Sequence, residues 1–178
     1  MKGLRKIIDM TKMKESMEAL MEFLPKDPIF ICVGTDRVGF DSFGPVVGST
    51  LKRAGFKVYG TITDPMDAKT IPEKLINVMI EEGIKDLEND DRIVAIDACV
   101  VSEPEYLYKV ILRDIGIKPG SGLGKDLPKI GCRSIVFPTV LEGEDIREKI
   151  INEGEDKGIS VSAAKMLGIL IDGLTVMA

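Results

Sequence analysis

The chain has 178 residues, with 24 basic and 29 acidic side chains, a formal charge of −5 and no histidine. This acidic balance argues against a protein that grips nucleic acid through a basic field, so we expect no nucleic-acid partner. The lack of histidine excludes serine–histidine and cysteine–histidine nucleophile pairs and every imidazole metal ligand. The length and a hydrophobic content of 44% predict one globular domain over residues 1–178.

Cysteine use and hydropathy indicate the compartment. Cys32, Cys99 and Cys132 are odd in number and too far apart for a metal clamp, which fits a reducing cytoplasm better than a disulfide framework. Charged residues interrupt the first 25 residues, where a signal peptide needs an apolar core. The most apolar stretch, 163–178, contains two charges and is shorter than the roughly 20 residues of a membrane span. We therefore expect a cytoplasmic protein with no membrane partner. We expect no cofactor and no bound metal: Asp36, Asp41 and Asp97 could bind a hard cation such as magnesium, but no recognisable metal-binding loop surrounds them.

The first half of the chain alternates helices and strands. Over residues 1–25, apolar residues rich in methionine recur every three or four positions up to a proline, which predicts an N-terminal amphipathic helix whose methionines pack in the core. A continuous apolar run at 29–33 predicts a strand buried on both faces. Further signals predict, in order, a helix over 44–55, a strand over 57–62, a helix over 71–82 and a strand over 93–96.

The second half is less regular. Residues 106–112 and 115–118 suggest two strands about a tight turn, and 133–137 suggests another strand. A last helix over 160–177 has an apolar face that would pack on the sheet or on a second subunit, which allows a homo-oligomer. The alternation of strands and helices predicts an α/β fold, a three-layer α/β/α sandwich with a mixed, mostly parallel sheet.

Acidic residues follow two of the predicted parallel strands. Asp36 and Asp41 come after the first, and Asp97 ends the third. Ligands of such sheets bind beyond the carboxyl ends of the strands, so neighbouring strands would bring Asp41 and Asp97 together. Two close carboxylates share a proton near neutrality and can activate water. The structural alternatives are a helix cap at Asp41, a turn cap at Asp97 and a surface ion pair between Asp36 and Arg37.

A glycine-rich segment spans residues 119–128, PGSGLGKDLP. It is not a phosphate-binding P-loop, because proline and aspartate stand where that pattern needs glycine and serine or threonine. The amides of Gly122 and Gly124 can approach a ligand backbone closely, and Lys125 offers a cation beside the acidic pair. The alternative is a plain surface turn.

Cys99 lies two residues beyond Asp97 and is the one tempting nucleophile. No histidine is present to take its proton, and acidic neighbours raise a thiol pKa. We therefore expect Cys99 to be a small packing residue.

Three blocks occur in the order CVGTDRVGFDSFGP, VAIDAC and KPGSGLGKDLPKIG. Together they resemble the sporulation protein YyaC family, which is similar to the germination protease of spore-forming bacteria and, more distantly, to hydrogenase maturation proteases. The resemblance spans about residues 29–137 and implies a phosphorylase- or hydrolase-like sandwich. It also implies that Asp41 and Asp97 take the places of the catalytic aspartates of the germination protease. Metal-guided cleavage, which in the hydrogenase maturation proteases involves a histidine, is not expected here.

The resemblance implies a sporulation-associated peptidase whose aspartates activate water against a peptide or a small spore protein. Asp36, Gly122, Gly124 and Lys125 are the expected binding residues. The alternative is a catalytically inactive regulator that binds a peptide or a partner on the same scaffold. One departure is visible: the family often has a histidine where this chain has Asp67, so no role of that histidine carries over.

Overall fold

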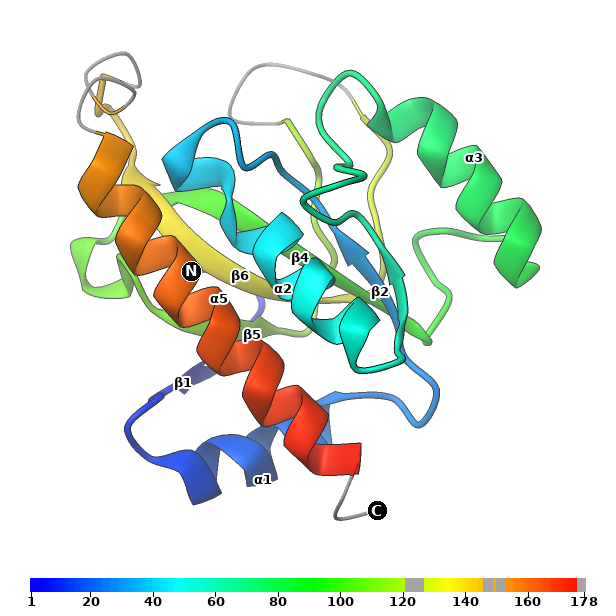
Figure 1. The fold of residues 1–178 in the computed structure, drawn as a ribbon, viewed down its shortest axis with the longest axis horizontal. Helices are drawn as coiled ribbons and strands as arrows, with labels where there is room; N and C mark the ends of the chain where they lie inside the picture. Colours follow the sequence, from blue (N-terminus) through cyan, green and yellow to red (C-terminus); the bar gives the residue numbers. More distant parts are fainter. Residues whose placement is uncertain (121–126, 146–148, 150–152, 176–178) are drawn as a thin grey trace.

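A computed structural model describes residues 1–120, 127–145, 149 and 153–175. Within these ranges the chain forms one six-stranded sheet with helices on both faces (Figure 1). The elements run in the order β1 (Leu4–Ile8), α1 (Met13–Phe23), β2 (Ile29–Cys32), η1 (Gly39–Asp41), α2 (Phe43–Arg53), β3 (Lys57–Tyr59), α3 (Ile71–Glu82), β4 (Ile93–Val101), η2 (Pro104–Tyr106), β5 (Val110–Arg113), β6 (Arg133–Leu141) and α5 (Glu153–Thr175).

The sheet is mixed and mostly parallel, as predicted. Its strand order is β1-β5-β6-β4-β2-β3. The strands β3, β2, β4 and β6 pair in parallel, whereas β5 is antiparallel to β6 and to β1. Parallel neighbours need long crossover connections, and α2 and α3 supply the connections from β2 to β3 and from β3 to β4. The central position of β2 and β4 puts the segments that follow them at the same edge of the sheet.

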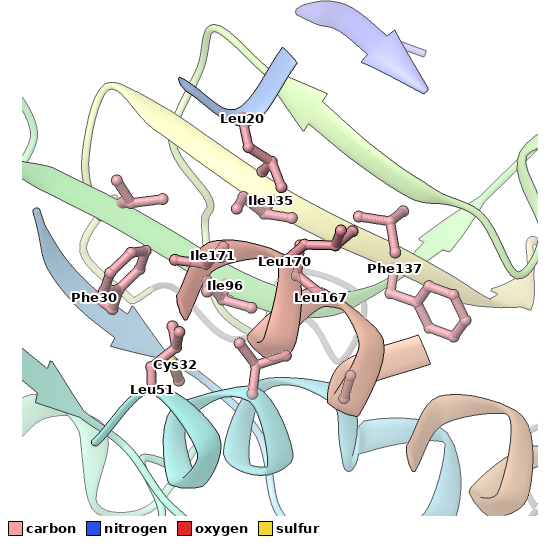
Figure 2. Packing of buried hydrophobic residues seen from close by; sticks show 14 of the residues in the cluster. Leu20, Phe30, Cys32, Leu51, Ile96, Ile135, Phe137, Leu167, Leu170 and Ile171 are labelled. Carbon is pink, nitrogen blue, oxygen red and sulfur yellow. The ribbon is translucent and has the colours of Figure 1, made fainter. Parts of the chain in front are cut away.

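Two apolar clusters separate the three layers. The cluster under α1, α2 and α5 is the larger (Figure 2), and α5 lies beside α2 across this face (Figure 1). The cluster under α3 covers the opposite face of the sheet. Along β2, Phe30 and Cys32 belong to the first cluster, and Ile29 and Ile31 belong to the second. A strand covered on both faces therefore reads as the unbroken apolar run seen in the sequence.

The N-terminal prediction is wrong in part. The helix covers Met13–Phe23 only, and Leu4–Ile8 forms β1, antiparallel to β5. Edge pairing with β5 decides the conformation of this segment, and only Ile8 of β1 is buried. The methionine stripe is core only in part: Met10 and Met17 pack against the larger cluster, whereas Met13 is 59% exposed and Met21 is 52% exposed. The buried face of α1 consists of Ser16, Ala19, Leu20 and Phe23.

Two strand predictions need correction at the site end of the sheet. The strand that carries Asp97 does not end there: β4 continues to Val101, because β6 runs to Leu141 and keeps pairing with it. The pair of strands predicted around 106–118 reduces to β5, Val110–Arg113, since β1 and β6 flank only this part. Beyond β5, Ile117 forms a single bridge with Ile130.

The last helix starts earlier than predicted. It begins at Glu153 instead of Ser160, and the expected end near Met177 lies outside the described residues. Its buried face contains Ala164, Leu167 and Ile171, which pack over the sheet in the cluster of Figure 2. Searched over the described ranges, no helix combines the length and the apolarity that a membrane crossing needs.

Candidate functional site

The turn after β2 folds back tightly because two glycines permit close backbone approaches. Gly34 has φ +126°, a conformation that side-chain-bearing residues rarely adopt, and a Cβ there would lie 2.3 Å from the carbonyl oxygen of Asp41. A Cβ on Gly44 would lie 2.1 Å from the carbonyl oxygen of Val33. The two contacts bring both sides of the turn against each other, with Asp41 on the inside.

Hydrogen bonds then fasten the turn at both ends. The backbone N–H of Thr35 donates to the carbonyl oxygen of Asp41 over 3.1 Å and to its Oδ2 over 3.0 Å. On the other side, the buried hydroxyl of Thr139 in β6 donates to the carbonyl oxygen of Phe40 over 2.8 Å. Asp41 is therefore held between the end of β2 and the end of β6.

Asp97 reaches the same edge through the strand register. In the parallel pair of β2 and β4, Cys32 lies opposite Ile96, and the N–H of Val33 donates to the carbonyl oxygen of Ile96 over 2.7 Å. The residue after Ile96, Asp97, thus lies beside the turn that holds Asp41. Strand alternation points Asp97 to the α3 side of the sheet, the side of Cys99 and the second apolar cluster.

Burial and neighbouring negative charges raise the pKa of both aspartates. Burial, opposed by the Thr35 amide and assisted by the charge of Asp67, raises the pKa of Asp41 to about 7. Burial and the charge of Asp41 raise the pKa of Asp97 well above its ordinary value. Two such groups titrate as a coupled pair. At neutral pH the pair therefore retains a proton.

Sequence reasoning missed a third carboxylate at this edge, Asp67. Val33 forms a parallel bridge with Met66, and the N–H of Gly34 donates to the carbonyl oxygen of Met66 over 3.1 Å. Asp67 follows immediately, and its charge acts on Asp41. An available signal was the run Asp67-Ala-Lys-Thr before Pro72, which is typical of a capped helix start near a crevice.

The predicted binding residues divide into two groups. Asp36 lies in the turn after β2, where its carbonyl oxygen accepts a hydrogen bond from Nζ of Lys157 in α5 over 3.0 Å. Gly122, Gly124 and Lys125 lie outside the described residues. Leu127, which follows them in the chain, packs against the apolar cluster on the side to which Asp97 points.

Cys99 is half-buried and belongs to this face of the sheet. Burial and the charge of Asp97, partly offset by Arg113, raise the pKa of its thiol to about 12. A thiol that stays protonated is a poor nucleophile. The chemistry of the site therefore rests on carboxyl groups.

The aspartate pair is suited to proton transfer. In the part of the chain that the structure describes, no three histidine, cysteine, aspartate or glutamate side chains are grouped to hold a metal ion. A pair that keeps one proton near neutrality offers one base and one acid side by side. This combination can take a proton from water and deliver another to a leaving group.

Comparison with known proteins supports part of the expected resemblance. The chain is 36% identical over 109 residues to uncharacterized protein YyaC of Bacillus subtilis (strain 168), in an alignment that covers 60% of this chain and 50% of that protein. The chain thus spans about half the length of this curated relative. Likeness to YyaC is confirmed, whereas likeness to the germination protease stays a prediction. The family described as "Protein of unknown function (DUF1256)" matches residues 5–155, which include Asp41 and Asp97, and the chain belongs to this family.

Proposed function

We propose that this protein is a peptidase that uses the aspartate pair, Asp41 and Asp97, to activate water against a peptide carbonyl. The observation that carries the proposal is the convergence of two carboxyl groups with raised pKa values where β2 and β4 approach the same edge. Perturbed carboxyl pairs of this kind are more frequent in catalytic sites than on ordinary surfaces.

The hydrogen bond from the Thr35 amide stabilises an ionised Asp41, which favours Asp41 as the base and leaves Asp97 as the acid. Ionised Asp41 removes a proton from water while the water oxygen attacks the carbonyl carbon, and protonated Asp97 transfers its proton to the carbonyl oxygen. In the second step, Asp41 gives its proton to the amine nitrogen as the carbon–nitrogen bond breaks. The hydroxyl formed on the carbon returns its proton to Asp97. Both aspartates then regain their starting states, and one water has been consumed.

The substrate class follows from the sequence blocks. Their resemblance to the germination protease supports a role in sporulation, in the cytoplasm, with an unstructured peptide or a small spore protein as substrate. We infer that Asp36, which lies in the turn that carries Asp41, contacts bound peptide. In this proposal, Gly122 and Gly124 bind the substrate backbone, and Lys125 stabilises the developing charge on the carbonyl oxygen.

The test compares peptide hydrolysis by the wild type, Asp41→Asn and Asp97→Asn. Small acid-soluble spore proteins and a pool of unstructured peptides serve as substrates, and mass spectrometry identifies new termini. Each substitution removes one proton-transfer group and should lower the rate by at least about 100-fold. The exposed Asp91 is a matched control, and Asp91→Asn should cleave like the wild type. Cleavage that persists unchanged in both site variants rules the aspartate mechanism out.

A second candidate function is a regulator that binds a partner or peptide without cleaving it. One observation favours it: α1 exposes Met13 and Met21, whose flexible side chains suit adaptable binding surfaces. Isothermal titration with the same peptides separates the two functions. Binding without new termini, lost in a Met13→Lys and Met21→Lys double variant but kept in Asp41→Asn, supports the regulator. Turnover that depends on the aspartate pair supports the peptidase.

A further inference from the structure

Asp67 is fixed beside the turn that holds Asp41, although the two residues belong to different connections. Met66 is buried and joins the end of β2 through its bridge with Val33 and its hydrogen bond from Gly34. The residues that follow the bridge on the two segments are therefore carried to the same place. On one side these are Gly34 and then Thr35, which holds Asp41, and on the other side the residue is Asp67.

Hydrogen bonds keep the carboxylate of Asp67 in one position. Its Oδ1 accepts from the N–H of Lys69 over 2.8 Å, the N–H of Thr70 over 3.0 Å and the hydroxyl of Thr70 over 3.2 Å. Burial by itself would raise the pKa of Asp67, but these bonds outweigh burial and lower it. Asp67 is therefore a fixed negative charge at neutral pH. Among the described residues, no group donates to its Oδ2.

The charges around Asp41 come from several elements. Asp67 and the exposed Arg37 lie on the connections beside it, and Arg37 also acts on Asp67. Asp97 lies at the same edge on β4 and interacts with the charge of Asp41, and the charges of Asp97 and of Arg113 in β5 act on the thiol of Cys99. From α5, Lys157 is bound to the carbonyl oxygen of Asp36. Of these groups, Asp67 combines a rigid position with a full negative charge that acts on Asp41.

We propose that Asp67 is a positioning residue of this site, a third carboxylate whose fixed negative charge opposes a negative charge on Asp41. The arrangement divides the labour among the three acids. In the proposed reaction Asp41 and Asp97 exchange protons, while Asp67 stays ionised and makes Asp41 harder to ionise. Without Asp67, Asp41 would ionise at a lower pH, so the base of the proposed reaction would form at a lower pH. The consequence of the Asp67 charge for catalysis rests on the proposed function, but its effect on the protonation of Asp41 does not.

The test is a titration of the aspartate carboxyl carbons by NMR on the full chain without substrate. The signals of Asp41 and Asp97 are assigned by their loss in Asp41→Asn and Asp97→Asn. In Asp67→Asn, the amide oxygen still accepts the bonds from residues 69 and 70, so the local fold is kept while the charge is removed. We expect the titration midpoint of Asp41 to fall by roughly half a pH unit or more.

Asp64→Asn is the matched control. It removes an equal charge from Asp64, which lies three residues before Asp67 and whose side chain is exposed and paired with Lys74. It should leave the midpoint of Asp41 unchanged. An unchanged midpoint in Asp67→Asn, or an equal fall in Asp64→Asn, overturns the role of Asp67. If the protein cleaves no peptide, but the titration midpoint of Asp41 falls in Asp67→Asn and not in Asp64→Asn, the proposed peptidase function is rejected and this inference stands. If cleavage occurs, the pH profile of kcat/KM should move with the titration.

Discussion

The backbone amide of Thr35 binds Asp41 twice, at the carbonyl oxygen and at Oδ2. One donor thus closes the turn after β2 and orients the carboxyl group at the same time. This bond stabilises the ionised form and opposes the effect of burial on the pKa of Asp41. The backbone geometry of the turn and the protonation of Asp41 are therefore coupled, and changes to the turn should alter the site.

Gly34→Ala should lower the free energy of unfolding and should also displace Asp41. The new Cβ would meet the carbonyl oxygen of Asp41 at 2.3 Å in a backbone conformation that alanine avoids. We expect a loss of about 2 to 5 kcal/mol in the free energy of unfolding and a displaced Asp41, since both strain and overpacking contribute. Urea unfolding measures the first effect, and the carboxyl titration of Asp41 measures the second.

Gly55→Ala is the control for Gly34→Ala. Gly55 has φ +90° and open space around a Cβ, so this substitution introduces backbone strain without a clash. It should cost about 1 to 2 kcal/mol and leave the titration of Asp41 at its wild-type midpoint. Equal effects of the two substitutions would show that close packing against Asp41 has no special importance.

Thr139→Val should loosen the other end of the turn. Valine keeps the shape of the buried side chain but removes the hydroxyl that donates to the carbonyl oxygen of Phe40. The loss of one buried hydrogen bond should cost about 1 to 3 kcal/mol. Amide hydrogen exchange should become faster at Asp41, and Thr139→Ser, which keeps the hydroxyl, should retain more of the protection. Exchange at Asp41 that is the same in all three proteins would contradict this role.

Much of the fold was readable because its signals are local. The helix predicted over 71–82 is observed as Ile71–Glu82, with Pro72 in its first turn and Gly83 in the left-handed conformation at its end. The buried strands β2 and β4 were found because burial on both faces leaves a continuous apolar run. By contrast, β1 depends on pairing with β5, more than 100 residues away, and its own periodicity resembles that of a helix.

The site was predictable only where the strand order carries the information. Asp41 and Asp97 come to the same edge because β2 and β4 are neighbours, which the alternation of elements suggests. Asp67 was missed because the run before Pro72 indicates a helix start but not its neighbours, and the bridge between Val33 and Met66 is what brings Asp67 beside Asp41. The roles of these residues stay predictions that the titrations and cleavage assays above decide.

Cys99 should be chemically inert and dispensable for hydrolysis. With a thiol pKa of about 12, only about one molecule in ten thousand carries a thiolate at pH 8. Iodoacetamide should therefore label Cys99 in the native protein far more slowly than in urea, as peptide mass spectrometry can show. Cys99→Ala should keep peptide cleavage within about twofold of the wild type. Rapid native labelling together with loss of cleavage in Cys99→Ala would point to a thiol mechanism instead.

The aspartate pair should make the protein less stable as the pH rises from about 4 to above 7. Between the ordinary pKa of 3.8 and the folded value of about 7, folded Asp41 holds a proton that the unfolded chain has released. Because the folded state binds more protons in this window, the free energy of unfolding falls with increasing pH, by as much as about 4 kcal/mol for Asp41 alone. Asp41→Asn should flatten this dependence and be more stable than the wild type at pH 8, whereas Asp91→Asn should follow the wild-type curve. Urea unfolding at pH 5, 6, 7 and 8 measures the slope, and a wild-type stability that increases over this interval would show that the pair is not buried with raised pKa values.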